Sequence, residues 1–178
     1  MIIFRSDIRG DESVNNTFHY TSPLGGITLS SDSETLTGLW FDGQKYFPHK
    51  LISESNEAEL PIFTQTCNWL DIYFGGKEPD FTLPISLHTT PFRKIVYDIL
   101  LTIPYGQTMT YGEIARILAD QQGAEHMSAQ AVGSAVGHNP VSIIIPCHRV
   151  VGADGSLTGY AGGLDKKTAL LKLEKYEI

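Results

Sequence analysis

The chain has 178 residues, of which 42% are hydrophobic and 19% are charged, and its formal net charge is −7 at pH 7. This composition excludes wholesale disorder, and no apolar run approaches the ~20 residues that a membrane-spanning helix needs. Two cysteines exclude a disulfide framework, and the charges of Arg5 and Asp7 argue against a secretory signal peptide. We therefore expect a cytoplasmic protein with no membrane partner.

The negative charge is confined to the first half of the chain. Residues 1–89 contain 5 Lys/Arg and 12 Asp/Glu, whereas residues 90–178 contain 8 of each. Nucleic-acid binding that depends mainly on phosphate contacts needs clustered Lys and Arg. The charge alone therefore does not identify a partner, although the neutral second half leaves room for a local basic face.

Residues 1–89 predict a small N-terminal α+β domain with a linker at its end. Residues 26–30 and 36–41 have the apolar pattern of strands, and a turn signal precedes a third apolar segment at 45–47. Together these segments predict an antiparallel meander. Residues 77–90 contain two prolines and no clear period, which is typical of a linker.

A helical period begins after Asn56 and ends at Gly75-Gly76. Its predicted buried face consists of four residues spaced three or four apart, Phe63, Cys67, Leu70 and Phe74. Because Cys67 lies on this face, we interpret it as a structural cysteine.

Residues 90–178 predict a mainly helical C-terminal domain. An amphipathic helix begins at Pro91, a second begins at Thr110 with a capping box to Glu113, and Ser128 caps a third. The last two helices, joined by a polar connector, have the layout of a helix-turn-helix. The predicted fold class is α+β, with a small antiparallel-sheet domain followed by a mainly helical domain that contains this helix-turn-helix.

The third helix, residues 129–136, consists almost entirely of small residues. A usual recognition helix carries long polar side chains that read bases in the major groove, and this helix has almost none. Tight packing against another helix and close approach to a narrow groove explain the pattern equally well.

Cys147 is the strongest candidate for chemistry in the chain. The β-branched run at residues 141–145 predicts a buried strand, which leads to Cys147 beside His148 and Arg149. Neighbouring positive or proton-accepting groups favour the thiolate, which is the nucleophilic form of cysteine. A zinc site, a papain-like protease and a buried structural cysteine are the alternatives. From these residues alone, the nucleophile and the structural cysteine remain equally good interpretations.

The segment Ile145-Pro146-Cys147-His148-Arg149-Val150-Val151 resembles the active-site signature of the O6-alkylguanine-DNA alkyltransferases of bacterial type. Further segments resemble the family in order and spacing: residues 40–45, 73–77, 103–115, 131–133, 139–140, 159–164 and 170–174. The resemblance is strong over residues 91–175 and loose before them.

This resemblance implies a catalytic set. Cys147 is the expected alkyl acceptor, and His148 is the expected base that acts on it through a water molecule. Glu174 is expected to orient the imidazole, and Asn139 to hold the network. Tyr160 matches a tyrosine that donates a proton to the departing guanine or polarises it. Residues Gly162 and Gly163 are the expected thin wall of the base pocket.

The resemblance also implies a DNA-binding set. The small-residue helix is expected to lie in the minor groove of double-stranded DNA, and Tyr111 to drive rotation of the damaged nucleotide out of the stack. The DNA-binding residues expected on this basis are Tyr111, Gln130, Ala131, Gly133, Ser134 and Arg149. For Arg149 an internal structural tie is the stronger expectation. Gln130 departs from the family, which commonly has an arginine there, so weaker DNA affinity is expected.

The function implied is repair by direct reversal: one irreversible transfer from O6-alkylguanine, with O4-alkylthymine as a second candidate substrate. The resemblance implies a monomer without a cofactor. We expect no metal, because the cysteines that hold zinc in some relatives are absent. The rival functions are a damage-sensing module similar to the alkyltransferase-like proteins, a transcriptional regulator and a thiol hydrolase. The acceptor Cys147 disfavours the first, the small-residue helix disfavours the second, and the third lacks a motif for an oxyanion site.

Overall fold

The structure is a computed structural model that describes residues 15–175. The charged N-terminal segment that argues against a signal peptide lies outside these residues. The chain divides into two compact units between His88 and Thr89. Within residues 15–175, no helix combines the length and the apolar character needed to cross a membrane.

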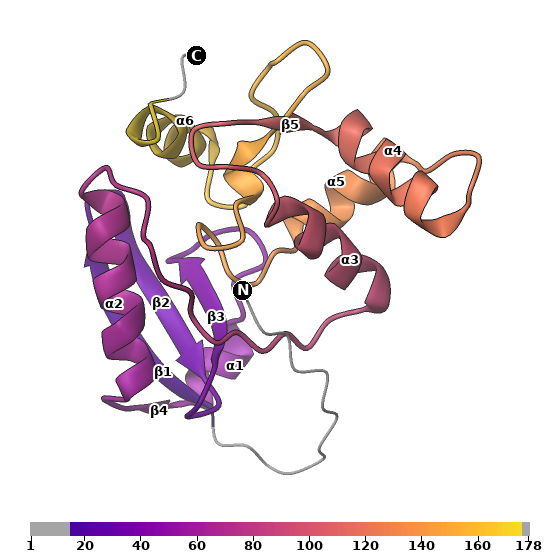
Figure 1. The fold of residues 1–178 in the computed structure, drawn as a ribbon. Helices are drawn as coiled ribbons and strands as arrows, with labels where there is room; N and C mark the ends of the chain where they lie inside the picture. Colours follow the sequence, from indigo (N-terminus) through magenta and orange to yellow (C-terminus); the bar gives the residue numbers. More distant parts are fainter. Residues whose placement is uncertain (1–14, 176–178) are drawn as a thin grey trace. The chain divides into compact units, whose positions relative to one another are not determined.

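A four-stranded sheet forms the centre of the N-terminal unit (Figure 1). Strands β1 (Asn16–Ser22), β2 (Gly25–Ser31) and β3 (Leu36–Phe41) form an antiparallel meander, and the two-residue β4 (Asn56–Glu57) pairs in parallel with β1. The predicted antiparallel sheet is confirmed for the three long strands, of which β1 was not predicted. The parallel pairing of β4 makes the whole sheet mixed.

The strand predicted at residues 45–47 does not form. The backbone N–H of Phe41 donates to the side-chain Oε1 of Gln44 at 3.0 Å, and Tyr46 has a φ of 63°. A positive φ is incompatible with a pleated strand, so the chain turns here and enters the short helix α1 (His49–Ser53).

Helix α2 (Pro61–Phe74) packs against β1 and β2 and ends at Gly75, as predicted (Figure 1). Its buried face is rotated slightly from the predicted one, so that Cys67 and Phe74 are only half-buried. The side chains that are buried instead include Thr66 and Tyr73. Burial of the polar Thr66 side chain is tolerated because its hydroxyl donates to the Ile62 carbonyl oxygen at 2.8 Å.

The segment predicted as a linker, residues 77–90, is largely part of the N-terminal unit. Leu83 and Ile85 are buried, and Ile85 forms an isolated parallel bridge with Leu36. The linker prediction is wrong for most of this segment because it relied on the absence of a hydrophobic period. Two buried apolar residues are enough to fix an irregular segment in the core of the unit.

The C-terminal unit contains three helices in mutual contact, α3 (Pro91–Leu100), α4 (Tyr111–Gln122) and α5 (Ala129–Gly137). All three begin as predicted, and the Thr110–Glu113 capping box and the Ser128 cap both form. A short connector joins α4 to α5, which is the order that the predicted helix-turn-helix requires (Figure 1). Helix α6 (Leu164–Leu173) completes the unit.

A two-residue parallel ladder joins distant parts of this unit. Strand β5 (Met109–Thr110) pairs with β6 (Val150–Val151), which directly follows a 3-10 helix at Cys147–Arg149. Because Tyr111 follows β5, the ladder places the start of α4 beside the segment that contains Cys147. This pairing was not predicted, since two residues carry no detectable period.

The buried strand predicted at residues 141–145 is wrong: the segment is buried, but it forms consecutive turns. The Ile144 N–H donates to the Ser142 carbonyl oxygen at 2.9 Å, and Ile143 between them has a φ of 70°. This is a tight three-residue turn that a β-branched side chain rarely adopts. The β-branched composition predicted burial correctly and backbone conformation incorrectly.

Candidate active site

Cys147 lies at the start of the 3-10 helix with only 3% of its surface exposed. The Asn139 side chain reaches it from the end of α5. Its Nδ2 group donates to the Cys147 Sγ at 3.1 Å and to the Ile145 carbonyl oxygen at 2.8 Å, while its Oδ1 accepts from the Val141 N–H at 3.0 Å. One amide therefore fixes the turns before the cysteine and provides a donor to its sulfur.

The Cys147 thiol is protonated at neutral pH in this environment. Burial raises its pKa to about 11, although the Asn139 hydrogen bond, the charge of Lys167 and nearby backbone N–H groups favour the thiolate. Burial dominates because charged sulfur loses its hydration. Cys147 therefore needs a base at the moment of reaction.

His148 is the nearest candidate for that base. Its Nε2 lies 2.8 Å from the Oε1 of Glu174, and neither side chain is exposed. If the Nε2 proton is donated to the carboxylate, the buried Nδ1 is the basic nitrogen of the ring. Burial lowers the pKa of His148, against the opposing effect of Glu174, so the imidazole is neutral at rest.

Glu174 is the centre of a buried charge network. Burial alone would raise its pKa, but hydrogen bonds from His148 and Arg149 outweigh burial and hold the pKa of the carboxyl well below its usual range. The backbone N–H of Gly106 also donates to Oε2 at 3.1 Å. Glu174 therefore remains ionised and holds the imidazole in one orientation.

The Arg149 guanidinium makes its hydrogen bonds to groups within the C-terminal unit. Its Nε and Nη2 donate to Glu174 at 2.8 and 3.0 Å, its Nη1 donates to the Ile103 carbonyl oxygen at 2.7 Å, and its guanidinium lies over the Tyr105 ring. Only 11% of the side chain is exposed. These contacts argue against its place in the DNA-binding set and agree with the expected internal tie.

Tyr97, Tyr111 and Tyr160 lie close enough to Cys147 to interact with its charge, and the Tyr97 hydroxyl is held by hydrogen bonds to the Ala135 and His138 carbonyl oxygens. The Tyr160 hydroxyl is buried near Ser142, and burial together with Cys147 raises its pKa well above 10. Tyr111 is half-buried; burial raises its pKa too, while a hydrogen bond with the Thr158 side chain opposes the shift. The phenols of Tyr111 and Tyr160 are therefore protonated, and both are candidate proton donors.

The glycines after Tyr160 form the turn that leads into α6. Gly163 has a φ of 97°, and a Cβ there would lie 2.6 Å from the Asp165 carboxylate, so a larger residue would be strained. Its N–H donates to the Tyr160 carbonyl oxygen at 3.0 Å. Gly162 lies half-buried in the same turn. This turn holds Tyr160 close to the start of α6.

The predicted DNA-binding residues of α5 lie on its outward side. Gln130 and Ser134 are exposed, and Ala131 and Gly133 are partly exposed. A Cβ on Gly133 would lie 3.7 Å from the Tyr111 ring, so this side of α5 adjoins that tyrosine. The structure thus brings Cys147, His148, Asn139, Glu174, Tyr111 and Tyr160 to one region, with the exposed side of α5 next to Tyr111.

Lys167 is a member of this region that the sequence analysis missed. Its side chain is fully buried on α6, and the charge of its ammonium group acts on both Cys147 and His148. A signal was present in the sequence: Lys167 precedes Leu170, Leu171 and Glu174 by three, four and seven residues, the spacing of one helical face.

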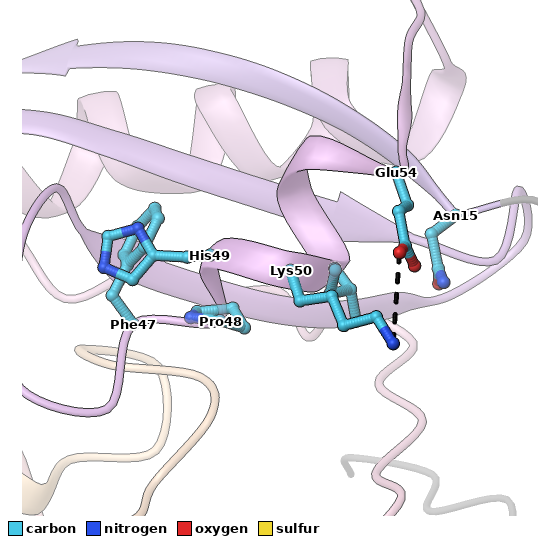
Figure 2. Close-up of a pocket in the computed structure, with 7 residues that line it drawn as sticks. Asn15, Phe47, Pro48, His49, Lys50 and Glu54 are labelled. Carbon is cyan, nitrogen blue, oxygen red and sulfur yellow. Dashed lines mark ion pairs between the residues drawn. The ribbon is translucent and has the colours of Figure 1, made fainter.

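Within residues 15–175, no group of three or more His, Cys, Asp and Glu side chains has an arrangement that could hold a metal ion. A surface pocket of about 660 Å³ lies in the N-terminal unit (Figure 2). It is lined by Asn15, Phe47, Pro48, His49, Lys50, Leu51 and Glu54. Lys50 and Glu54 form an exposed ion pair of 4.0 Å there, and the pocket contains no predicted site residue.

Comparison with known families gives matches to both units. Residues 18–87 match the model of the 6-O-methylguanine DNA methyltransferase ribonuclease-like domain, and residues 91–176 match that of the DNA binding domain of the same enzyme. The chain is 46% identical over 155 residues to the methylated-DNA–protein-cysteine methyltransferase of Mycobacterium tuberculosis, which covers 86% of this chain and 88% of that one. The inducible enzyme of Bacillus subtilis is 38% identical over 159 residues, covering 89% and 84% of the two chains.

Solved structures give the same result. The M. tuberculosis O6-methylguanine methyltransferase has a TM-score of 0.78 and 43% identity, covering 91% of this chain and 93% of that one. The M. tuberculosis OGT in complex with DNA has a TM-score of 0.74 and 42% identity, with coverages of 90% and 92%. Both family domains are present in order and account for most of the sequence, and the chain therefore belongs to the 6-O-methylguanine DNA methyltransferase family.

Proposed function

We propose that this protein repairs DNA by direct reversal, transferring the alkyl group of an O6-alkylguanine to Cys147 in a single irreversible turnover. The observation that carries the proposal is the buried Cys147 thiol, which accepts a hydrogen bond from Asn139 and directly precedes a histidine paired with a buried carboxylate. Family membership supports the reaction and the substrate class.

The proposed step is a displacement at the alkyl carbon. The Cys147 proton passes through a water molecule to His148, and the sulfur attacks the carbon attached to O6. The sulfur–carbon bond forms, the oxygen–carbon bond breaks, and its electron pair remains on the guanine. Glu174 stabilises the imidazolium that results, because the two side chains already share a hydrogen bond. The thioether has no route back, so each molecule reacts once.

A proton must also reach the guanine as it departs, since a protonated purine is the better leaving group. We assign this role to Tyr160, whose buried hydroxyl remains protonated beside the cysteine. Tyr111 is the competing candidate because its phenol also interacts with Cys147. Single-turnover rates of Tyr160→Phe and Tyr111→Phe on a saturating duplex, with nucleotide rotation followed separately by the fluorescence of a 2-aminopurine beside the lesion, distinguish the two, since loss of the donor slows transfer without slowing rotation.

The proposed partner is double-stranded DNA, approached through its minor groove by α5 of the helix-turn-helix. The small outward side chains of α5 allow its backbone close to the groove, and Tyr111 beside it rotates the damaged nucleotide outward. Gly162 and Gly163 then form the wall of the base pocket. The relative crystallised with DNA supports this choice of partner.

We propose that the catalytic and DNA-binding functions belong to a domain of residues 90–178, preceded by an α+β domain with linker at 1–89. The protein acts as a monomer without a cofactor. A cytoplasmic location is proposed because both described cysteines are free and the reaction requires a reduced thiol.

Intact and peptide mass spectrometry tests the reaction directly. The protein is mixed with a duplex containing one O6-methylguanine, and one methyl group is expected on the peptide that contains Cys147, with guanine restored. Cys147→Ser is expected to bind the duplex without reacting. An unmodified wild-type protein that still binds the damaged duplex would replace this proposal with damage sensing.

A further inference from the structure

Lys167 is buried without a carboxylate partner among residues 15–175. Its Nζ donates to the Val150 carbonyl oxygen and to the Thr158 carbonyl oxygen, both at 2.6 Å, and 0% of its surface is exposed. Burying an ammonium group is unfavourable unless other groups compensate its charge. The dipoles of two carbonyl groups compensate the ammonium charge only partly. A net positive potential therefore remains inside the C-terminal unit.

The groups that face this charge belong to the proposed chemistry. The Lys167 ammonium favours the Cys147 thiolate, and it disfavours the protonated form of His148. Burial lowers the pKa of Lys167 to about 8, and Cys147 is the only titratable group that acts on it in the opposite direction within the described residues. A thiolate at Cys147 would therefore add to the compensation of the lysine charge.

The two hydrogen bonds of Lys167 also join parts of the site. Val150 belongs to β6, directly after the 3-10 helix of Cys147, and Thr158 belongs to the loop that carries Tyr160. The Thr158 side chain in turn interacts with Tyr111. One ammonium group thus holds the cysteine segment and the loop that carries Tyr160 at a defined separation.

Resting on the proposed function, we propose that Lys167 is a positioning residue for alkyl transfer, which stabilises the Cys147 thiolate by its buried charge and ties the Tyr160 loop to β6. Proton transfer from Cys147 to His148 separates charge inside the protein. A fixed cation whose charge acts on the sulfur lowers the free energy of the thiolate without having to reorient during the reaction, and its opposing effect on the imidazolium is offset by the hydrogen bond between His148 and Glu174.

Three substitutions separate the charge of Lys167 from its other contributions. Lys167→Arg keeps a charge and donors, Lys167→Gln keeps donors without a charge, and Lys167→Met keeps only a side chain of similar length. Lys172→Gln, at an exposed position of the same helix, is the matched control.

The first readout is the rate at which iodoacetamide modifies Cys147 between pH 6.5 and 7.5, where Lys167 with its pKa of about 8 is still mostly charged, followed by peptide mass spectrometry. Each unit of increase in the pKa of the thiol lowers the thiolate fraction tenfold. We therefore expect Lys167→Gln and Lys167→Met to slow the modification of Cys147 about tenfold or more, and Lys167→Arg to remain nearer to wild type. Cys67 in the same sample is the internal reference, and its rate is expected to stay unchanged.

The second readout is single-turnover methyl transfer from a saturating duplex, with the Tm measured on the same preparations. The charge-free variants are expected to lose rate by the same factor as in the iodoacetamide reaction. Wild-type reactivity of Cys147 in both charge-free variants would overturn the inference. A parallel change in the modification rate of Cys67 and in the Tm would also overturn it, because such a change indicates a structural role. Because iodoacetamide needs no DNA, failure of the proposed function is seen separately, as wild-type protein that does not accept a methyl group.

Discussion

Glu174 and His148 are joined by a hydrogen bond of 2.8 Å between Oε1 and Nε2, and neither side chain has any exposed surface. Arg149 and the Gly106 N–H donate to the same carboxylate. Because these donors keep the carboxylate ionised, it can stabilise a positive charge on the imidazole. The same group also joins the end of α6 to the segment around Cys147, so it serves both the fold and the proposed reaction.

Replacing Glu174 with glutamine is expected to reduce both stability and reaction rate. Arg149 would lose its only carboxylate partner within residues 15–175, and removing one member of a buried ion pair costs about 3–5 kcal/mol. His148 would lose the group that stabilises its protonated form, and we expect alkyl transfer to slow roughly a hundredfold. Urea denaturation and single-turnover kinetics measure the two effects. Asp120→Asn, the same chemical change at an exposed position of α4, is the control and is expected to change neither.

Stability is expected to fall as the pH decreases below neutrality, because folding lowers the pKa of His148 through burial. Between the ordinary pKa of about 6.5 and the lower pKa in the fold, the unfolded chain binds a proton that the folded chain does not. The contribution of His148 is therefore complete above about pH 6.5 and is lost below it, at no more than about 1.4 kcal/mol per pH unit.

Urea denaturation of wild type and His148→Gln between pH 5 and 8 measures this dependence. The Glu174 carboxyl has a lowered pKa in the fold, so its own contribution is lost only below the ordinary value of about 4.3, outside this range. Equal pH dependence in the two proteins would rule out a contribution from His148.

Gln130 is expected to influence DNA binding without influencing the chemical step. It is exposed at the start of α5, and it has neither the charge nor the reach of an arginine. Gln130→Arg is expected to bind an undamaged duplex several-fold more tightly, and Gln130→Ala to bind it more weakly. Fluorescence anisotropy measures both affinities at a fixed salt concentration. Single-turnover rates on saturating damaged duplex are expected to agree among all three proteins; a change in those rates would place Gln130 in the chemistry instead.

The alkylated protein is expected to be less stable than the unreacted one. The sulfur of Cys147 is enclosed, with 3% of the residue exposed, and added carbon atoms in a packed interior typically cost about 1–3 kcal/mol. The hydrogen bond from Asn139 to the sulfur is also weakened, since a thioether is a poor acceptor. Scanning calorimetry of methylated and unreacted protein is expected to record a Tm lower by several degrees for the methylated form. Benzylated protein provides the comparison, and an equal or higher Tm in both adducts would contradict this expectation.

The starts of α3, α4 and α5 could be predicted from the sequence because local contacts determine them, whereas helix α6 was not predicted. The Thr110–Glu113 capping box and the Ser128 cap join residues only three positions apart, and both form in the structure. The strands β2 and β3 were found for a related reason, since their short apolar patterns are local, although most of their residues are buried on both faces of the sheet. The resemblance around Cys147 identified the family without any structural information.

Local patterns failed where contacts from outside a segment decided its backbone conformation. The β-branched residues 141–145 favour a strand, but Asn139 accepts from the Val141 N–H and donates to the Ile145 carbonyl oxygen. These bonds replace the ladder that a strand would need, so turns result. Likewise β5 and β6 have two residues each, and only their pairing across the C-terminal unit makes them strands.

The sequence by itself thus determined the family, the starts of three C-terminal helices and the candidate nucleophile, because each of these depends on local contacts or on a contiguous motif. The tertiary structure decided the protonation states and the partners. Burial makes Cys147 a thiol at rest, Arg149 is drawn inward by Glu174, and Lys167 becomes an internal cation. The physical reason is that the free energy of a charged group depends on its hydration and on the groups that folding brings close to it. Neither of these can be read from a local sequence pattern.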